Sequence, residues 1–230
     1  MRNLKVEELA EELRDAVVHY DEERAKELAG KLLEMDVDPI EIIEKYLVPA
    51  MKVVGELFDE GEYYLPHLML AGDAMKAATG ILTADLSEKR RRLSERKRKA
   101  GTIVIGTVEG DLHDIGKNIV ALLLEVNGFD VYDLGREISP MEFVEKAEVV
   151  NADIIALSSL MSTTMAYQAE TIRYLKELGL REKYKIIVGG GPTSESWAEN
   201  IGADGWAKDA PGAVELAKRL LRSKETIKND

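Results

Sequence analysis

The sequence of 230 residues predicts an α/β protein, in which a four-helix bundle is followed by a doubly wound parallel sheet of five strands. Two observations carry this prediction. Up to residue 88 apolar side chains recur at helical spacing, and from residue 101 short apolar runs alternate with helix-length segments. A basic segment, KRRRLSERKRK at 89–99, lies between these parts. We therefore expect a helical domain at 1–88, a basic linker at 89–100 and an α/β domain at 101–230.

Four helices are predicted in the first part. Apolar residues from Leu4 to Val17 define the first helix, and the second covers 21–34. The third begins at Asp38-Pro39, because aspartate caps a helix and proline suits its first position, and Pro49 should kink it. The segment GEYY at 61–64 ends that helix, and Pro66 opens the fourth. Four helices joined by short connections favour a small bundle.

The second part alternates between two kinds of segment. Apolar runs typical of strands occur at 102–107, 130–134, 153–159, 185–190 and 205–207, and helical segments occur at 114–127, 140–150, 164–179, from 194 onward, and at 211–222. Strand–helix alternation of this length produces βαβ units and hence a parallel sheet, here of the Rossmann-like (flavodoxin-like) kind. Strands as apolar as these suit burial on both faces of the sheet.

The composition excludes several kinds of functional site and several classes of protein. The chain has no cysteine, which excludes disulfides, thiolate metal sites and cysteine nucleophiles, so redox chemistry must use a bound cofactor or a partner. Its net charge of −12 argues against nucleic-acid binding, and the basic segment is interpreted as a solvated linker rather than a nucleic-acid patch. There is neither an apolar run of about 18 residues nor a signal-peptide core, which predicts a cytoplasmic protein without membrane attachment.

Three unusual clusters follow predicted strands. GDLHDIG follows the first strand, SSLMSTT the third and GGGPTS the fourth. Because the carboxyl ends of parallel strands share one edge of a sheet, we expect these clusters to lie together where ligands of open α/β sheets bind. Neither a G-x-G-x-x-G after a strand nor a Walker A sequence is present, so the glycines alone do not predict a nucleotide. Taken by itself, the glycine run could equally be a turn.

His113 is the candidate metal ligand in the first cluster. A ligating imidazole normally gives its other N–H to a carboxylate, and Asp111 is suitably close in sequence. Asp114 is interpreted as the start of the following helix. A single histidine cannot hold a bare ion tightly, so the metal would have to arrive inside a cofactor that supplies its other ligands. A helix-start or loop histidine without a ligand remains the alternative.

The spacing of these residues resembles the cobalamin-binding domains of methionine synthase and of corrinoid proteins from methanogen and acetogen methyltransferase systems. The family motif D-x-H-x-x-G is matched by Asp111, His113 and Gly116. After 41 residues Ser158-Ser159-Leu160 matches S-x-L, and after 28 more Gly189-Gly190 matches G-G. The earlier stretch MKVVGELFDEGEYYLPHLMLAGDAMK at 51–76 is similar to the helical cap of the methyl-carrying members. The resemblance therefore covers both halves of the chain.

The resemblance implies a role for individual residues. His113 would be the lower axial ligand of the corrin's cobalt, with Asp111 and then Thr164 behind it in a relay, although Thr163 competes for the last place. In the cap, Phe58 and Leu65 would lie over the upper face of the corrin and Glu44 would contact it; ordinary bundle core is the alternative for the two apolar residues. The remaining residues expected at the cofactor are Gly110, Leu112, Asp114, Ile115, Gly116, Ser158, Leu160, Ser162, Gly189, Gly190, Gly191, Pro192 and Ala210.

The implied function is that of a methyl carrier with cobalamin or a related corrinoid as cofactor. Its cobalt would accept a methyl group as Co(I) from a substrate-specific methyltransferase and donate it as methyl-Co(III) to a second methyltransferase that uses tetrahydrofolate or coenzyme M. A reductive activase would rescue oxidised cobalt, and the helical cap would move aside for each partner. The alternatives are a small subunit of an adenosylcobalamin mutase, a cobalamin-sensing regulatory module, or a flavodoxin-like or receiver domain without cobalt.

Overall fold

A computed structural model describes residues 2–35, 37–84 and 100–227. The chain divides into two compact units, residues 1–88 and 89–230, and each is described by itself. Almost all of the linker predicted at 89–100 lies outside the described residues.

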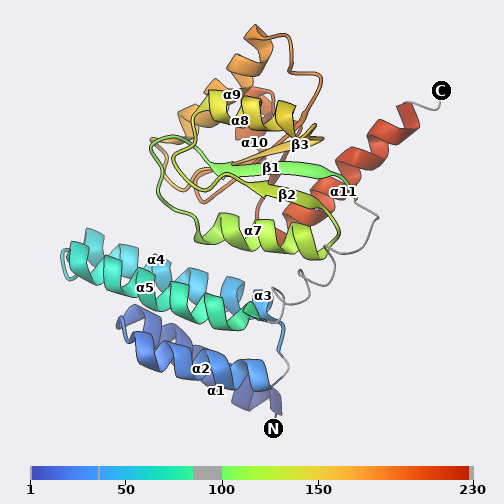
Figure 1. The fold of residues 1–230 in the computed structure, drawn as a ribbon. Helices are drawn as coiled ribbons and strands as arrows, with labels where there is room; N and C mark the ends of the chain where they lie inside the picture. The colour runs from blue at the N-terminus through green and yellow to red at the C-terminus, as the bar shows by residue number, and fades with distance from the viewer. Residues whose placement is uncertain (1, 36, 85–99, 228–230) are drawn as a thin grey trace. The chain divides into compact units, whose positions relative to one another are not determined.

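The first unit consists of helices throughout its described residues (Figure 1). Asp38 accepts a hydrogen bond from the Ile40 backbone N–H, as expected of a cap. The interruption predicted near Pro49 takes the form of a π-helical turn just before it, because proline has no N–H to continue the α-helical ladder. The elements are α1 (Arg2–Val18), α2 (Glu22–Glu34), α3 (Pro39–Ile42), the π-helix η1 (Ile43–Leu47), α4 (Val48–Asp59) and α5 (Leu65–Leu82).

The core of this unit is built from leucine, isoleucine, valine and alanine. Alanine predominates on the buried face of α5, at Ala71, Ala74 and Ala78, which lets that helix approach its neighbours closely. The larger buried side chains include Leu13, Leu28, Leu32, Ile43, Leu47 and Leu82.

The second unit is the predicted doubly wound sheet. Its five strands are all parallel and are arranged in the order β2-β1-β3-β4-β5. The elements are β1 (Thr102–Thr107), α7 (Ile115–Val126), β2 (Asp130–Asp133), α8 (Pro140–Val149), β3 (Ile154–Ser158), α9 (Met165–Glu177), β4 (Lys185–Gly189), α10 (Glu195–Ile201), β5 (Gly205–Ala207) and α11 (Ala210–Ile227).

Helices cover both faces of the sheet, and each face has its own core. On one face Phe143 of α8 and Leu175 of α9 pack against strand residues such as Val104 and Ile155. On the other face α7 and α11 pack against Ile103 and neighbouring strand residues (Figure 1). This two-sided burial explains why the strands are apolar at successive positions rather than at alternate ones. No helix among the described residues is both long and apolar enough to cross a membrane.

The strand order places a topological switch point between β1 and β3. From β1 the chain passes to β2 on one side, and β3 lies on the other. At the carboxyl edge Thr107 pairs with Ser158, and Ser158 pairs with Gly189. The three clusters singled out in the sequence therefore follow three adjacent strands at the edge where open α/β sheets bind ligands.

Candidate functional site

The loop after β1 carries His113 and is held by hydrogen bonds to the end of that strand. Thr107, the last residue of β1, is fully buried and donates its hydroxyl to the His113 carbonyl at 3.0 Å. Gly110 lies at φ +75°, a conformation that favours glycine, and lets the chain turn toward Asp111. The Asp111 backbone N–H donates to the Val108 carbonyl at 3.2 Å. The loop is therefore held to the sheet on both sides of its turn.

Asp111 is the centre of the site and has no exposed side-chain surface. Its Oδ1 lies 2.8 Å from the His113 Nδ1 and accepts the His113 backbone N–H at 3.1 Å. Its Oδ2 accepts the Thr164 hydroxyl and the Leu160 N–H, both at 2.8 Å, and the Met161 N–H at 3.2 Å. Burial alone would raise the pKa of the Asp111 carboxyl, but the hydrogen bonds from His113, Thr164 and Leu160 outweigh it and lower that pKa.

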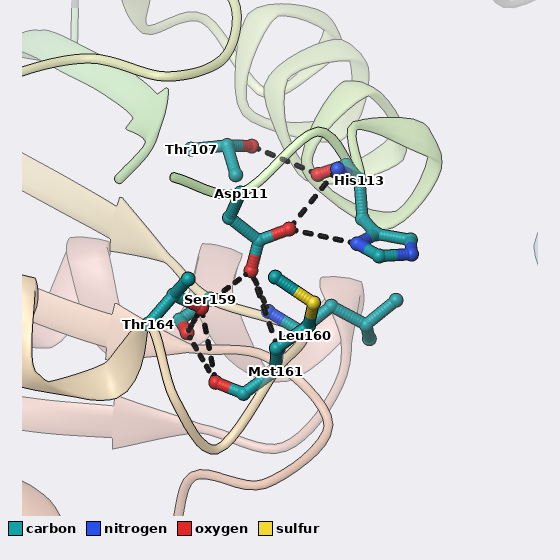
Figure 2. Close-up of polar contacts among 7 residues, drawn as sticks. All are labelled: Thr107, Asp111, His113, Ser159, Leu160, Met161 and Thr164. Atoms are coloured by element: carbon teal, nitrogen blue, oxygen red, sulfur yellow. Dashed lines mark hydrogen bonds and ion pairs between the residues drawn. The ribbon is translucent and has the colours of Figure 1, made fainter. Parts of the chain in front are cut away.

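The ionised carboxylate decides which nitrogen of His113 carries hydrogen. A carboxylate only accepts hydrogen bonds, so Nδ1 must be the donor, and a neutral ring then has its lone pair on Nε2. The His113 side chain is 52% exposed, and Nε2 makes no hydrogen bond to any described residue. Figure 2 shows this nitrogen pointing away from the Asp111 network. The geometry is that of an imidazole oriented to ligate something outside the protein.

Thr164 occupies the place behind Asp111 that the sequence left open between two threonines. It is buried and contacts the carboxylate, whereas Thr163 is exposed. The sequence reasoning missed Ser159, which is fully buried with its hydroxyl 2.8 Å from that of Thr164. The serine doublet at 158–159 was a signal, but only the bend after β3 determines which of the two side chains points inward.

The glycine turn after β4 closes against the loop after β3. Gly190 lies at φ +118°, and a Cβ atom there would be 1.8 Å from the Ser159 carbonyl oxygen. No residue but glycine fits this approach without displacing backbone. Thr193 donates its hydroxyl to the Gly190 carbonyl at 2.6 Å and accepts the Trp206 indole N–H at 2.9 Å. These contacts brace the glycine turn, and the Ser159 backbone N–H joins the loop after β3 to it by donating to the Gly189 carbonyl at 3.1 Å.

The helix α7 has Asp114 at its start, as the sequence predicts, but the side chain of this aspartate does not cap it. Asp114 occupies the N-cap position, but its φ of −124° and ψ of −11° are not those of a capping aspartate, and its side chain makes no cap hydrogen bond. Instead Lys117, almost fully buried, reaches the Asp133 carboxylate of β2 at 2.5 and 2.6 Å. Gly116 lies between these residues, and a Cβ atom there would meet nothing within 4 Å.

The other predicted contact residues form the margin of this edge. Leu112 and Leu160 are 54% and 50% exposed. Leu112 lies beside His113 in the loop after β1, and Leu160 lies in the loop after β3, where its backbone N–H donates to Asp111. The other predicted residues make no hydrogen bond to Asp111 or His113. Ser158, Ser162, Gly189, Gly191 and Pro192 lie at or after the ends of β3 and β4, whereas Ile115 begins α7 and the buried Ala210 begins α11.

Three predicted contact residues belong to the helical unit. Phe58 and Leu65 are 41% and 63% exposed, so they are not part of the bundle core that was the alternative for them. Glu44 lies half-buried in the π-helical turn η1, a type of irregularity that often occurs at functional sites.

Comparison with known proteins identifies the family. Residues 101–215 match the family described as B12 binding domain, and residues 9–83 match a second family of the same description. Dimethylamine corrinoid protein 2 of Methanosarcina acetivorans is 48% identical to this chain over 95% of it and 98% of that protein. The chain belongs to the B12-binding corrinoid proteins.

Solved structures agree with this assignment. The monomethylamine corrinoid protein of Methanosarcina barkeri is 35% identical and covers 93% of this corrinoid protein and 99% of its own chain, with a TM-score of 0.84. The methanol:cobalamin methyltransferase complex of the same organism is also similar, at 30% identity and a TM-score of 0.50, over 94% of this chain and 84% of that one. Cobalamin or a related corrinoid is therefore the cofactor of this protein.

The residues of the corrinoid protein fit this cofactor. Among the described residues no three histidine, aspartate or glutamate side chains gather in a way that could hold a metal ion. His113 by itself suits a metal whose other ligands come from a macrocycle. The open space at Gly116 and the exposed Leu112 and Leu160 suit a large, partly apolar group at this edge.

Replacing Asp111 by asparagine should change how stability depends on pH. The lowered pKa means that the Asp111 carboxylate stabilises the fold above its unfolded pKa of about 3.9 and that this contribution disappears as pH falls through the lower folded value. We expect Asp111→Asn to lower the free energy of unfolding by about 1–3 kcal/mol at pH 7 and by less below pH ~4. Denaturant titrations of the apoprotein at both pH values, followed by tryptophan fluorescence, measure this change in the free energy of unfolding.

Both tryptophans, Trp197 and Trp206, are in the α/β unit, so their fluorescence reports on the unit that contains Asp111. Asp114→Asn is the matched control, because that neighbouring side chain makes no cap hydrogen bond. An Asp111→Asn protein that is as stable as the wild type at pH 7 would contradict the stabilising role of the carboxylate.

Proposed function

We propose that this corrinoid protein is a methyl carrier in a multi-component methyltransferase system, with His113 as the lower axial ligand of its cofactor. The bound corrinoid supplies a cobalt atom that can accept a methyl group and pass it on. One observation carries the proposal: the exposed His113 ring presents an unpartnered Nε2 at the switch-point edge, and a buried carboxylate fixes the proton on Nδ1.

Each residue of the network has a distinct part in this function. Asp111 orients the imidazole and favours the form with a free Nε2 lone pair. Thr164 and the Leu160 and Met161 N–H groups keep Asp111 ionised, so the carboxylate would remain available to the His113 ring whether or not that ring holds a metal. A reversible ligand of this kind suits a metal that changes valence during each transfer.

The cofactor's nucleotide tail is proposed to enter the sheet edge beside β3 and β4. The open space at Gly116 and the close turn at Gly189-Gly190 support this path, since a tail must approach the backbone there. The Ser158 hydroxyl, which lies at the end of β3, and Ala210, at the start of α11, would flank it.

The helical unit is proposed to shield the methyl-bearing face of the corrin from water. Phe58 and Leu65 support this assignment, because they keep large apolar surfaces exposed although the unit has a complete alanine- and leucine-rich core. Glu44 would contact the rim of the corrin.

A methylated amine is the methyl donor that the relatives support best. Similar proteins are named for dimethylamine and monomethylamine, and a related complex is a methanol:cobalamin methyltransferase. The proposed partners are a substrate:corrinoid methyltransferase, a second methyltransferase that transfers to tetrahydrofolate or coenzyme M, and a reductive activase, since the chain has no cysteine of its own for redox rescue. The match of residues 9–83 disfavours a mutase small subunit, which would usually lack the helical cap.

The proposal predicts stable loading with corrinoid. Purified protein incubated with hydroxocobalamin should keep about one equivalent after desalting, with an absorption spectrum shifted from that of the free cofactor, because the edge residues described above would enclose the tail. Bovine serum albumin treated in the same way controls for non-specific retention. Complete loss of colour on desalting would contradict the function. Transfer from mono- and dimethylamine, but not methanol, in the presence of the matching methyltransferases would support the donor class.

A further inference from the structure

The strongest unassigned feature is the arrangement of hydroxyl groups behind Asp111. Thr164 Oγ1 lies 2.8 Å from the Asp111 Oδ2, 3.0 Å from the Met161 carbonyl oxygen and 2.8 Å from the Ser159 Oγ. A hydroxyl donates only one proton, so the carboxylate and the carbonyl compete for it. Ser159 Oγ also lies 3.1 Å from that same Met161 carbonyl. Figure 2 shows the contacts among these oxygen atoms. The position of the Ser159 proton therefore influences where the Thr164 proton points.

One arrangement satisfies these contacts best. If Ser159 donates to Thr164 and Thr164 donates to Asp111, each short oxygen–oxygen contact has a proton between its atoms. The Met161 carbonyl is not left without a donor, because it accepts the Thr164 backbone N–H at 3.1 Å. The carboxylate is the charged acceptor and so attracts the Thr164 proton more strongly than the carbonyl does. Hydrogen bonds in such a chain also strengthen one another.

We propose that Ser159 is a positioning residue that directs the Thr164 hydroxyl toward Asp111 and so holds the His113 ring in its ligating orientation. The second part of this inference rests on the proposed function of His113. Ser159 does not touch the cofactor edge itself, since it is fully buried. It acts through two other side chains, which distinguishes it from Thr164.

The backbone around Ser159 supports this role. Its N–H donates to the Gly189 carbonyl at 3.1 Å, and its own carbonyl lies where a side chain at Gly190 would be. The glycine turn after β4 therefore fixes the backbone of Ser159. The Ser159 hydroxyl in turn contacts Thr164, which is hydrogen-bonded to Asp111. Two loops that come from different strands, and that are proposed to contact different parts of the cofactor, are coupled through this residue.

The direct test observes the Thr164 hydroxyl proton by NMR in the apoprotein. In the wild type we expect a slowly exchanging hydroxyl resonance, because the proton is buried and shared with a carboxylate. In Ser159→Ala and Ser159→Cys we expect solvent exchange about fivefold faster, the factor that corresponds to one hydroxyl hydrogen bond. Cysteine fills the serine position with a slightly larger Sγ atom but donates weakly. Thr171→Val is the control, since it removes another fully buried hydroxyl, which bonds only within α9.

The outcomes separate the possibilities. An unchanged exchange rate of the Thr164 hydroxyl proton in Ser159→Ala would overturn the proposal. A faster rate in Ser159→Ala but not in Ser159→Cys would also overturn it, because lost packing alone would explain that result. A wild-type proton too mobile to observe would overturn it as well. This measurement needs no corrinoid and stands even if the proposed function fails.

The link to His113 is tested separately in the loaded protein. Nitrogen coupling in the electron paramagnetic resonance spectrum of the Co(II) form reports the ratio of His113-bound to unbound corrinoid. We expect Ser159→Ala to lower that ratio about fivefold at fixed pH, while Thr171→Val leaves it unchanged. If the Thr164 proton moves but this ratio does not, Ser159 has no effect on the ligand. If the wild-type protein retains no corrinoid, the proposed function is wrong and the NMR result is unaffected.

Discussion

His113→Gly should abolish nitrogen ligation of the cofactor without abolishing cofactor binding. The imidazole points outward from the Asp111 network, so its removal leaves Asp111, Thr164 and the sheet edge in place. The contacts proposed for the tail lie elsewhere, at Gly116 and Gly190. We therefore expect retention of corrinoid with complete loss of nitrogen coupling in the Co(II) spectrum. Methyl transfer should fall by at least about 100-fold, the upper end of the loss seen when residues behind a metal ligand are changed.

Chemical rescue distinguishes a lost ligand from a damaged fold. Glycine leaves a space the size of an imidazole beside the Asp111 carboxylate, so added imidazole should restore nitrogen coupling and part of the transfer rate. His19→Gly is the matched control, because His19 is an exposed histidine of the helical unit whose ring forms a hydrogen bond with the Asp15 carbonyl of the same helix. An unchanged methylated spectrum or unchanged nitrogen coupling in His113→Gly would show that His113 is not the ligand.

Sequence patterns were sufficient for the α/β unit because its segments are short and clearly bounded. Apolar runs followed by polar clusters located the strands to within one residue at each end, and the parallel order places the clusters on one edge. The motif spacing identified Asp111, His113 and Thr164 as candidates, and the structure brings these three side chains together.

Features that depend on tertiary packing could not be predicted in this way. The sequence left bundle core as the alternative for Phe58, because helical periodicity cannot distinguish a face that packs inward from one that remains exposed, as Phe58 does. Aspartate is a residue type that commonly caps helices, but the backbone dihedral angles of Asp114 are not those of a cap. These angles are determined by the loop that begins at Asp111. The close approach of the Ser159 backbone to Gly190, which is distant in the sequence, depends on the pairing of β3 with β4.

Alanine substitutions at Gly190 and Gly116 should have opposite effects on stability and the same effect on cofactor binding. At Gly190 the new Cβ would lie 1.8 Å from the Ser159 carbonyl oxygen, on a backbone at φ +118° that alanine rarely adopts. Because the obstructing atoms are backbone, the ends of β3 and β4 must separate. We expect a loss of about 3 kcal/mol or more in the free energy of unfolding, measured by tryptophan fluorescence during denaturant titration.

Gly116→Ala tests the open space without this strain. Its Cβ would meet no atom within 4 Å, and in the first turn of α7 alanine should raise stability by up to about 1 kcal/mol. If the corrinoid tail passes this position, the added methyl group takes up its space, and retention of hydroxocobalamin should fall about tenfold. A Gly116→Ala protein that is more stable yet binds less corrinoid can be explained only by loss of space for the cofactor. Equal retention in Gly116→Ala and wild type would place the tail elsewhere, whereas loss in Gly190→Ala alone would be attributable to the disrupted fold.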